Sequence, residues 1–332
     1  MNINNMPQRI AQQIHKEILD KDNFLLVAHQ NPDGDAASSV SSFSQMLDQL
    51  GKKYTCFCKT DVSSQFEYLK NVDLFTSNPQ IWQQNYGAII VFDSGDLPYA
   101  GIDEFIKNVP NATLINIDHH ASNIHFGKLN LVRETLSSTV EVLFNYFLVN
   151  KIKINADMAT SLLTGLITDT DNFSNAATSK EALSMASYLV NKGAKLKKIH
   201  DYIVLDKNIA ILQLWGTVLN RLDTHEKTGV VYTYILQDDL KKCGVKEEEI
   251  GGLSNMMNHL KDGRAIFVFK EKSTGNIKAS TRTTREDTDL SKVAKLFGGG
   301  GHKKAAGFEV AGPMDKAIQH VWETIEKSNL IV

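Results

Sequence analysis

Aspartate and histidine residues occur in four short clusters within the first 171 residues, each at the end of a hydrophobic or helical segment. The clusters are His29 with Asp33 and Asp35, Asp93 with Asp96, Asp118 with His119 and His120, and Asp169 with Asp171. Carboxylate and imidazole ligands without thiolate suit manganese, magnesium or iron better than structural zinc. Carboxylates around one pocket also need cations to offset their mutual repulsion. We therefore predict a pair of divalent cations, a type of centre that cleaves phosphate esters.

These distant clusters can form one site only if a common scaffold brings them together. Three apolar runs typical of buried parallel strands each stop at a cluster: Phe24–Ala28 before His29, Ala88–Phe92 before Asp93, and Thr113–Ile117 before Asp118. Apolar residues at helical spacing predict helices at 35–50, 138–150, 156–167 and 180–191. Ligands of open α/β sheets bind at the carboxyl ends of the strands. We therefore expect an α/β domain with a mainly parallel sheet flanked by helices.

Each cluster alone also has an ordinary structural explanation. The sequence from Asn31 to Asp35 is a common turn followed by an N-cap aspartate. Ser138 and Glu141 fit a capping box, so we interpret them as a helix start rather than as chemistry. Adjacent histidines after an apolar strand are hard to explain by packing, although surface histidines would also fit. The match of four clusters to one sheet edge favours the metal centre.

Length and composition bound the class of protein. A chain of 332 residues predicts two domains, and 42% hydrophobic with 22% charged residues is ordinary for a soluble globular protein. No apolar run approaches the roughly 20 residues that span a membrane, and the N-terminus lacks a signal-peptide core. Three cysteines, without framework spacing, argue against a disulfide scaffold. We expect a cytoplasmic protein without a membrane partner.

The second half of the chain predicts a smaller α/β domain with a mixed sheet. We place the first domain at residues 1–192, a helical connector at 193–224 and the second domain at 225–332. The elements expected in the second domain are strands at Val230–Leu236, Ala265–Glu271, Asn276–Arg282 and Phe308–Val310, and helices at Glu247–Leu260, Leu290–Phe297 and Met314–Ser328. The second and third of these strands form a hairpin.

A run of four glycines, Gly298–Gly301, predicts an anion site in this second domain. Consecutive glycines let backbone N–H groups converge on an anion without interference from side chains. One glycine would be enough to end the preceding helix, whereas this segment has four. A guanidinium can also hold a phosphate with two parallel hydrogen bonds. The residues predicted to bind phosphate or nucleotide are Arg282, Gly299, Gly300, Gly301 and His302.

Together these residues resemble the motifs of the DHH phosphoesterase superfamily. The resemblance rests on His29-x-Asn-Pro-Asp-x-Asp35, Asp93, Asp118-His-His120 and Asp169, and on Arg282 with Gly298-Gly-Gly-Gly-His302 of a DHH-associated C-terminal domain. It covers nearly the whole chain in the expected order. Domain lengths and spacing most resemble the branch that combines nanoRNase activity with a phosphatase activity on 3′-phosphoadenosine 5′-phosphate (pAp).

The resemblance implies a role for each residue of the first domain. His29, Asp33 and Asp93 would hold one cation; Asp35, Asp93, His119 and Asp169 would hold the other, with Asp93 shared. Asp118 would support the histidine pair, and His120 would lie near the scissile phosphate as an acid or orienting group. The two cations would be Mn²⁺ first, with Mg²⁺ or Fe²⁺ as alternatives. The partners would be short RNA and pAp, hydrolysed by a hydroxide between the metals.

Several alternatives stay open at this point. The same metal chemistry would serve a cyclic di-AMP phosphodiesterase, a pyrophosphatase or an exopolyphosphatase, and a protein that only binds nucleic acid is the non-enzymatic alternative. A homodimer through helices of the first domain is also open. Tyr99, Phe173 and Tyr202 are candidates for stacking on bases, although packing is their more ordinary role.

Overall fold

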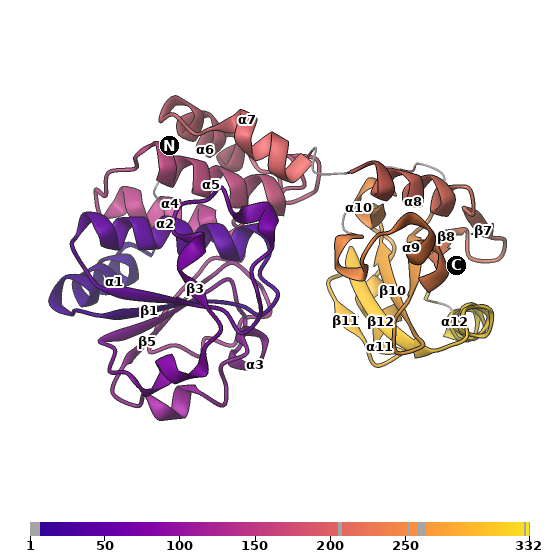
Figure 1. Ribbon diagram of the computed structural model, residues 1–332, viewed down its shortest axis with the longest axis horizontal. Coiled ribbons are helices and arrows are strands. Elements are labelled where there is room, and N and C mark those ends of the chain that lie inside the picture. Colours follow the sequence, from indigo (N-terminus) through magenta and orange to yellow (C-terminus); the bar gives the residue numbers. More distant parts are fainter. Residues whose placement is uncertain are drawn as a thin grey trace. The chain divides into compact units, whose positions relative to one another are not determined.

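The computed structural model describes residues 7–204, 208–250, 253–257, 260, 263–328 and 330–331. The chain divides into two compact units, residues 1–206 and 207–332 (Figure 1). The division falls inside residues 193–224, the range for which we expected a connector. Among the described residues no helix is long and apolar enough to cross a membrane.

The first unit contains a six-stranded sheet in which every described pair of neighbours is parallel, in the order β3-β2-β1-β4-β5-β6. The strands are β1 (Phe24–Ala28), β2 (Tyr54–Phe57), β3 (Phe75–Thr76), β4 (Ala88–Phe92), β5 (Thr113–Asp118) and β6 (Leu129–Val132). All five residues of β1 and of β4 are buried, because both faces of the sheet are covered. The predicted α/β class is confirmed.

Helices cover one face of this sheet, and shorter segments cover the other. The elements are α1 (Gln8–Asp20), α2 (Gly34–Gln49), α3 (Leu97–Ala100), α4 (Thr139–Val149), α5 (Ala156–Asp169), α6 (Lys180–Asn191), α7 (Leu196–Ile199), the 3₁₀ turns η2 (Ser64–Phe66), η3 (Val72–Leu74), η4 (Pro79–Gln83) and η5 (Ile106–Asn108), and the π-helical turn η6 (His200–Val204). Helices α1, α2, α4, α5 and α6 share one hydrophobic core with the sheet. Residues around η4, α3 and η5 form a second core on the opposite face (Figure 1).

Helix α2 lies at the centre of the helical layer. Every residue from Gly34 to Leu47 is buried, because alanines and serines along α2 let α4 and α5 pack closely on it. Two glycines mark the closest approach of these helices: a methyl group added at Gly34 would overlap the side chain of Thr168, and one added at Gly165 would meet Val140 and Asp35. This tight packing brings the start of α2 against the end of α5.

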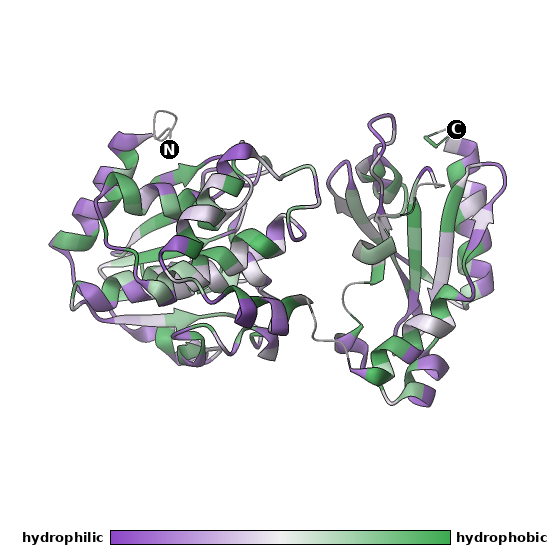
Figure 2. Ribbon diagram, turned by 90° about the horizontal axis from the view of Figure 1, so that it is seen from above, coloured by the Kyte–Doolittle hydropathy of each residue, from purple (hydrophilic) through white to green (hydrophobic). Residues whose placement is uncertain are grey.

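The second unit contains a mixed six-stranded sheet in the order β11-β12-β10-β9-β8-β7, in which β8 and β9 are parallel and the other pairs antiparallel. Its elements are α8 (Ile209–Leu219), β7 (Asp223–His225), β8 (Val230–Ile235), α9 (Gln237–Cys243), η7 (Glu247–Glu249), α10 (Leu253–Met257), β9 (Ile266–Glu271), β10 (Asn276–Arg282), α11 (Leu290–Lys295), β11 (Gly300–Gly301), β12 (Ala305–Ala311) and α12 (Met314–Ser328). Helices α11 and α12 pack on one face, and α8, α9 and α10 on the other. Figure 2 shows that the strands of both sheets are mostly hydrophobic.

Two expectations for this unit differ from the structure. The helix expected at Glu247–Leu260 is instead the turn η7 followed by the short helix α10, and residues 251–252 and 258–259 lie outside the described residues. The strand expected at Phe308–Val310 is longer, from Ala305 to Ala311, because its small residues pair with β10 although they have little strand preference of their own.

Candidate metal centre

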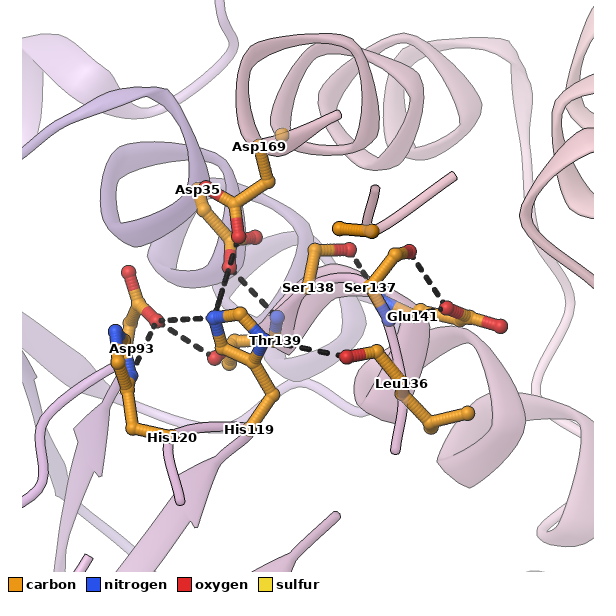
Figure 3. A network of polar contacts seen from close by, with 12 residues as sticks. Asp35, Asp93, His119, His120, Leu136, Ser137, Ser138, Thr139, Glu141 and Asp169 are labelled. Carbon is orange, nitrogen blue, oxygen red and sulfur yellow. Dashed lines mark hydrogen bonds and ion pairs between the residues drawn. The ribbon is translucent and has the colours of Figure 1, made fainter. Parts of the chain in front are cut away.

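The carboxyl edge of the first sheet gathers all six predicted metal ligands. His29 follows β1, Asp93 follows β4 and His119 follows β5, while Asp33 and Asp35 begin α2 and Asp169 ends α5. Three overlapping sets have donor atoms within 4.8 Å of one another: His29 with Asp33 and Asp93; Asp35 with His119 and Asp169; and Asp93 with His119 and His120. In Figure 3, Asp35 and Asp169 reach His119 from two helices, and Asp93 faces it from another side.

The two oxygens of Asp93 face different histidines. His29 Nε2 lies 3.6 Å from Asp93 Oδ2, and His119 Nε2 lies 3.7 Å from Asp93 Oδ1. On the first side, His29 Nε2 is also 3.8 Å from Asp33 Oδ1. On the second, His119 Nε2 is 3.2 Å from Asp169 Oδ2 and 4.0 Å from Asp35 Oδ2. A carboxylate placed in this way can be shared by two cations.

The backbone at Asp93 adopts a conformation that few residues other than glycine accept. Its φ angle is 57°, in the left-handed region where aspartate is among the more tolerated residues. The Asp93 N–H still donates to the carbonyl of Ile117 at 3.0 Å, so β4 stays joined to β5 up to this residue. The side chain of Asp93 is only 2% exposed. A strained residue at the centre of a polar cluster is typical of a functional site.

The N-terminus of α4 holds two of the carboxylates, a feature that the sequence analysis missed. Thr139 N–H donates to Asp35 Oδ2 at 2.6 Å, and Val140 N–H donates to Asp35 Oδ1 at 2.9 Å. The Thr139 hydroxyl donates to Asp93 Oδ1 at 2.8 Å (Figure 3). The positive end of a helix stabilises carboxylates in this position. The helix start at Ser138 was expected, but the target of its N–H groups depends on the packing of α4.

The predicted capping box at this helix start forms only in part. The Ser138 hydroxyl accepts the Glu141 N–H at 3.2 Å, as expected of an N-cap. The Glu141 carboxylate accepts instead from the N–H and hydroxyl of Ser137, at 2.8 and 2.6 Å. Both residues therefore belong to the helix start. Glu141 fixes the loop that contains the carbonyl of Leu136, to which His119 hydrogen-bonds.

Backbone carbonyls orient the two histidines that face Asp93. His29 Nδ1 lies 2.9 Å from the carbonyl of Gln30, and His119 Nδ1 lies 3.3 Å from the carbonyl of Leu136. A ring N–H donated to a carbonyl leaves Nε2 as the atom with a lone pair. In both rings Nε2 faces the carboxylates, so the neutral ring, with its N–H on Nδ1, would present its lone pair to a metal.

Asp118 binds neighbouring donors with both oxygens. Its Oδ1 accepts from the backbone N–H of His119 at 2.7 Å and lies 2.8 Å from His120 Nδ1. Its Oδ2 accepts from the side-chain amide of Asn123 at 2.5 Å. Asn123 in turn contacts Asn116 Oδ1, at 2.7 Å. The carboxylate of Asp118 thus hydrogen-bonds to both histidines of the pair. Asn123, which holds its other oxygen, is a further polar residue that was not predicted from the sequence.

The charges of the centre shift the pKa values of its groups. Burial disfavours the charged forms of His29 and His119, but nearby carboxylates outweigh it and raise their pKa values to about 12 and about 11. Burial, followed by the charge of Asp93, raises the pKa of Asp35 well above its usual value. Burial likewise raises the pKa of Asp169 to about 6, and Asp93 adds to it. The carboxylates therefore attract positive charge strongly.

Three of the predicted phosphate-binding residues, Arg282, Gly300 and His302, share one face of the second unit's sheet. Arg282 on β10 is opposite Ala305 on β12, and His302 exchanges backbone hydrogen bonds with Ala305 at 2.7 and 3.2 Å. Residues directly opposite one another project on the same face. Gly300 and Gly307 form the next row on this face. These small residues leave open sheet surface between the positions of Arg282 and His302.

The structure requires glycine for different reasons along the run that precedes His302. Gly298 has a φ of 72°, which favours glycine at the end of a helix. A methyl group at Gly299 would overlap Gly307 and Phe308, and one at Gly301 would overlap Ala305 and Ala306. A methyl group at Gly300 would meet nothing within 4 Å. Most of the glycine run is therefore needed for the path of the chain against β12.

The aromatic candidates lie in different surroundings. The ring of Tyr99 is half exposed and packs on His29, with centroids 4.9 Å apart. Phe173 packs against the main core of the first unit. Tyr202 packs on Tyr68 at 4.8 Å. Among the three, Tyr99 is the one whose ring contacts a residue of the metal cluster.

Comparison with known proteins yields two family matches. Residues 23–166 match the N-terminal domain of the DHH family, and residues 227–327 match the DHHA1 domain. The bifunctional oligoribonuclease and PAP phosphatase NrnA of Thermus thermophilus is 28% identical over 304 residues, covering 91% of this chain and 89% of that protein. The protein of the same name in Bacillus subtilis is 22% identical over 293 residues, covering 87% and 90%.

A solved structure shares the fold. The crystal structure of an exopolyphosphatase-related protein from Bacteroides fragilis superimposes with a TM-score of 0.90 at 21% identity, covering 98% of this chain and 97% of that one.

Proposed function

The chain belongs to the DHH family and has a C-terminal DHHA1 domain, and from this premise we propose that it hydrolyses short oligoribonucleotides, such as pApA and pGpG, to mononucleotides and removes the 3′-phosphate of pAp. Curated relatives matched over most of their length are named for these two activities. The observation that carries the proposal is Asp93, whose two oxygens face His29 and His119 at nearly equal distance. A carboxylate with this orientation could be shared by the two cations of a two-metal phosphoesterase.

The donor set fits two divalent cations with a preference for oxygen and imidazole ligands. His29, Asp33 and Asp93 would hold one, and Asp35, Asp93, His119 and Asp169 the other. Since no thiol belongs to the donor sets found among the described residues, Mn²⁺ is the first choice, before Mg²⁺ or Fe²⁺. Bound cations of this kind lower the pKa of a water to supply the nucleophile and neutralise charge on the phosphate.

The residues around the cations prepare the proton transfer to the leaving group. Hydrolysis breaks the bond between phosphorus and O3′, and O3′ leaves with a proton. His120 donates its Nδ1–H to Asp118, so its Nε2 is the ring atom that remains to meet the substrate. Burial lowers the pKa of His120, but the hydrogen bond to Asp118 outweighs it and raises the pKa, which favours the protonated ring. Asn123 holds the other oxygen of Asp118, so that the carboxylate keeps its orientation.

The second unit supplies the phosphate contact of this function. Arg282 and His302 lie on the same face of the sheet, separated by Ala305. The backbone of Gly299, Gly300 and Gly301 borders this surface, and Gly300 has open space above it. These residues bind a phosphate or a nucleotide of the substrate, and a residue larger than glycine at position 300 would cover the surface.

The test is a product time course with Mn²⁺ on pApA, pAp, cyclic di-AMP and pyrophosphate. His120→Asn is the test variant, and His125→Asn is its matched control, because His125 is an exposed histidine of the same loop. We expect the unmodified protein to hydrolyse pApA and pAp. His120→Asn should lose this hydrolysis but still bind Mn²⁺. His125→Asn should keep both the hydrolysis and the Mn²⁺ binding. Preferential cleavage of cyclic di-AMP or pyrophosphate would replace the proposed substrate. No turnover in spite of bound Mn²⁺ would refute an enzymatic function.

A further inference from the structure

A cavity of about 350 Å³ lies at the carboxyl ends of β2 and β3 in the first unit. The connection between β2 and β3 forms most of it. Its lining combines three carboxylates (Asp61, Glu67 and Asp73), five serine and threonine side chains, and an apolar surface of Val62, Val72 and Phe75. Its volume falls in the range of about 300 to 1,000 Å³ typical of small-molecule sites. The metal centre does not use any of these residues.

Hydrogen bonds to the loop between β1 and α2, which contains His29, fix the position of the cavity along the sheet edge. The Asn31 N–H donates to the hydroxyl of Thr60, a lining residue, at 2.6 Å. The Cys58 thiol, two residues earlier, donates to the carbonyl of His29 at 3.2 Å. Strands β2 and β3 lie next to β1 in the sheet, and neighbouring strands are about 4.8 Å apart. The cavity therefore begins within about two strand spacings of His29 on the carboxyl edge.

The helices of the metal centre also hold the β2–β3 connection. The Ser41 hydroxyl on α2 donates to the carbonyl of Lys70 at 2.6 Å. The Tyr68 hydroxyl hydrogen-bonds to Thr164 on α5 at 2.8 Å. These are the helices that supply Asp35 and Asp169. The same two helices thus contact the β2–β3 connection and supply ligands of the metal centre.

The lining disfavours phosphate and suits a nucleoside. No ion pair found among the described residues involves Asp61 or Asp73, and the partner of Glu67 is the hydroxyl of Tyr202 at 3.4 Å. Carboxylates without a neutralising cation repel a phosphate but accept hydrogen bonds from ribose hydroxyls and base amines. The apolar surface at Phe75 offers a face for a base ring.

We propose that this cavity binds the nucleoside on the 3′ side of the scissile phosphate, and that its carboxylates repel the phosphate that would follow. The proposal rests on the proposed function. When the bond between phosphorus and O3′ breaks, the phosphate stays on the next nucleoside in an oligonucleotide but leaves free in pAp. A dinucleotide therefore fills the cavity, whereas pAp never reaches it. A trinucleotide brings one more phosphate toward Asp61 and Asp73, which favours the shortest RNA.

The test measures kcat/KM for pAp, pApA and pApApA with two kinds of variant. The double variant Asp61→Asn, Asp73→Asn removes the charge, and Ser77→Trp fills the cavity. We expect the double variant to raise the ratio of kcat/KM for pApApA to kcat/KM for pApA by about fivefold. The effect should be smaller at high salt. We expect Ser77→Trp to lower kcat/KM for pApA by at least about tenfold. Hydrolysis of pAp should stay within about twofold in both, because pAp lacks a nucleoside in the cavity.

The matched control is Asp20→Asn, Asp22→Asn, which removes two exposed acids just before the amino end of β1. It should leave all three values unchanged. Equal losses on pAp and pApA would refute the cavity as a nucleoside site, as would unchanged values in both cavity variants. These results are distinct from failure of the proposed function, in which the unmodified protein would hydrolyse neither substrate. Because residues 61, 73 and 77 are exposed, the variants should keep the native melting temperature.

Discussion

Replacing Thr139 by valine tests whether the N-terminus of α4 positions the shared carboxylate. Valine keeps the shape of threonine but removes the hydroxyl that donates to Asp93 Oδ1 at 2.8 Å. Both residues are buried, and Asp93 stays ionised, because its contacts with the histidines lower its pKa although burial opposes this. A buried hydrogen bond to a charged group contributes about 2 kcal/mol.

The loss should appear in both stability and metal-dependent activity. For a unit of this size, about 2 kcal/mol corresponds to a fall of about 4 to 8 °C in the melting temperature, measured without metal. Groups that orient metal ligands typically contribute about 10- to 100-fold to metal affinity or activity. We therefore expect Thr139→Val to lower Mn²⁺ affinity and kcat/KM for pApA within that range.

The conservative variant Thr139→Ser separates orientation from packing. Serine keeps the donor but loses a buried methyl group, which costs about 1 kcal/mol. Its melting temperature should fall, while its Mn²⁺ affinity and kcat/KM stay within about threefold of the native values. If the valine and serine variants lost the same activity, packing rather than the hydroxyl would explain the effect. Native Mn²⁺ affinity in Thr139→Val would refute the assigned role of the hydrogen bond.

Three further perturbations test other parts of the structure. Gly165→Ala should lower Mn²⁺ affinity at least about tenfold in a titration, because the added methyl group meets a carboxylate ligand and a side chain of α4. Without metal, the carboxylates keep His29 and His119 protonated well above the usual pKa of 6.5, although burial opposes this. The melting temperature should therefore fall as the pH rises from about 6.5 toward 11, and saturating Mn²⁺ should remove this slope; a rising melting temperature would contradict it. Arg221→Met should destabilise the second unit by about 2 kcal/mol in denaturant unfolding, because it leaves buried Asp239 without its two guanidinium hydrogen bonds; a change in the first unit's transition would contradict this.

The central strands were predictable because burial on both faces leaves a strong sequence signal. The runs Phe24–Ala28 and Ala88–Phe92 are entirely apolar, and the structure confirms both strands with the expected bounds. The edge strand Leu129–Val132 is only partly buried and was not expected. Strand β3 has two residues, too few for any pattern. Helix α1 was missed although every third or fourth residue on its inner face is buried.

The candidate site shows the same division between local pattern and tertiary packing. The six predicted metal ligands are local features of strand ends and helix ends, and topology brings them together. Thr139 gave no such signal, because a threonine at a helix start is ordinary unless the helix points at a carboxylate. The common face of Arg282 and His302 depends on the register of β10, β12 and β11, which short glycine-rich strands do not reveal. The β2–β3 cavity arises from a long connection without regular pattern.

The order of the ligands along the chain has a consequence for biosynthesis. All six lie between His29 and Asp169, inside the first compact unit, and the last of them is the final residue of α5. A nascent chain has no complete set of donors until α5 has emerged from the ribosome, because Asp93 needs partners from both ends of this range. N-terminal units generally fold first during synthesis. Metal acquisition thus becomes feasible before translation of residues 207–332, and an assay for bound Mn²⁺ on stalled ribosomes would report when this unit closes.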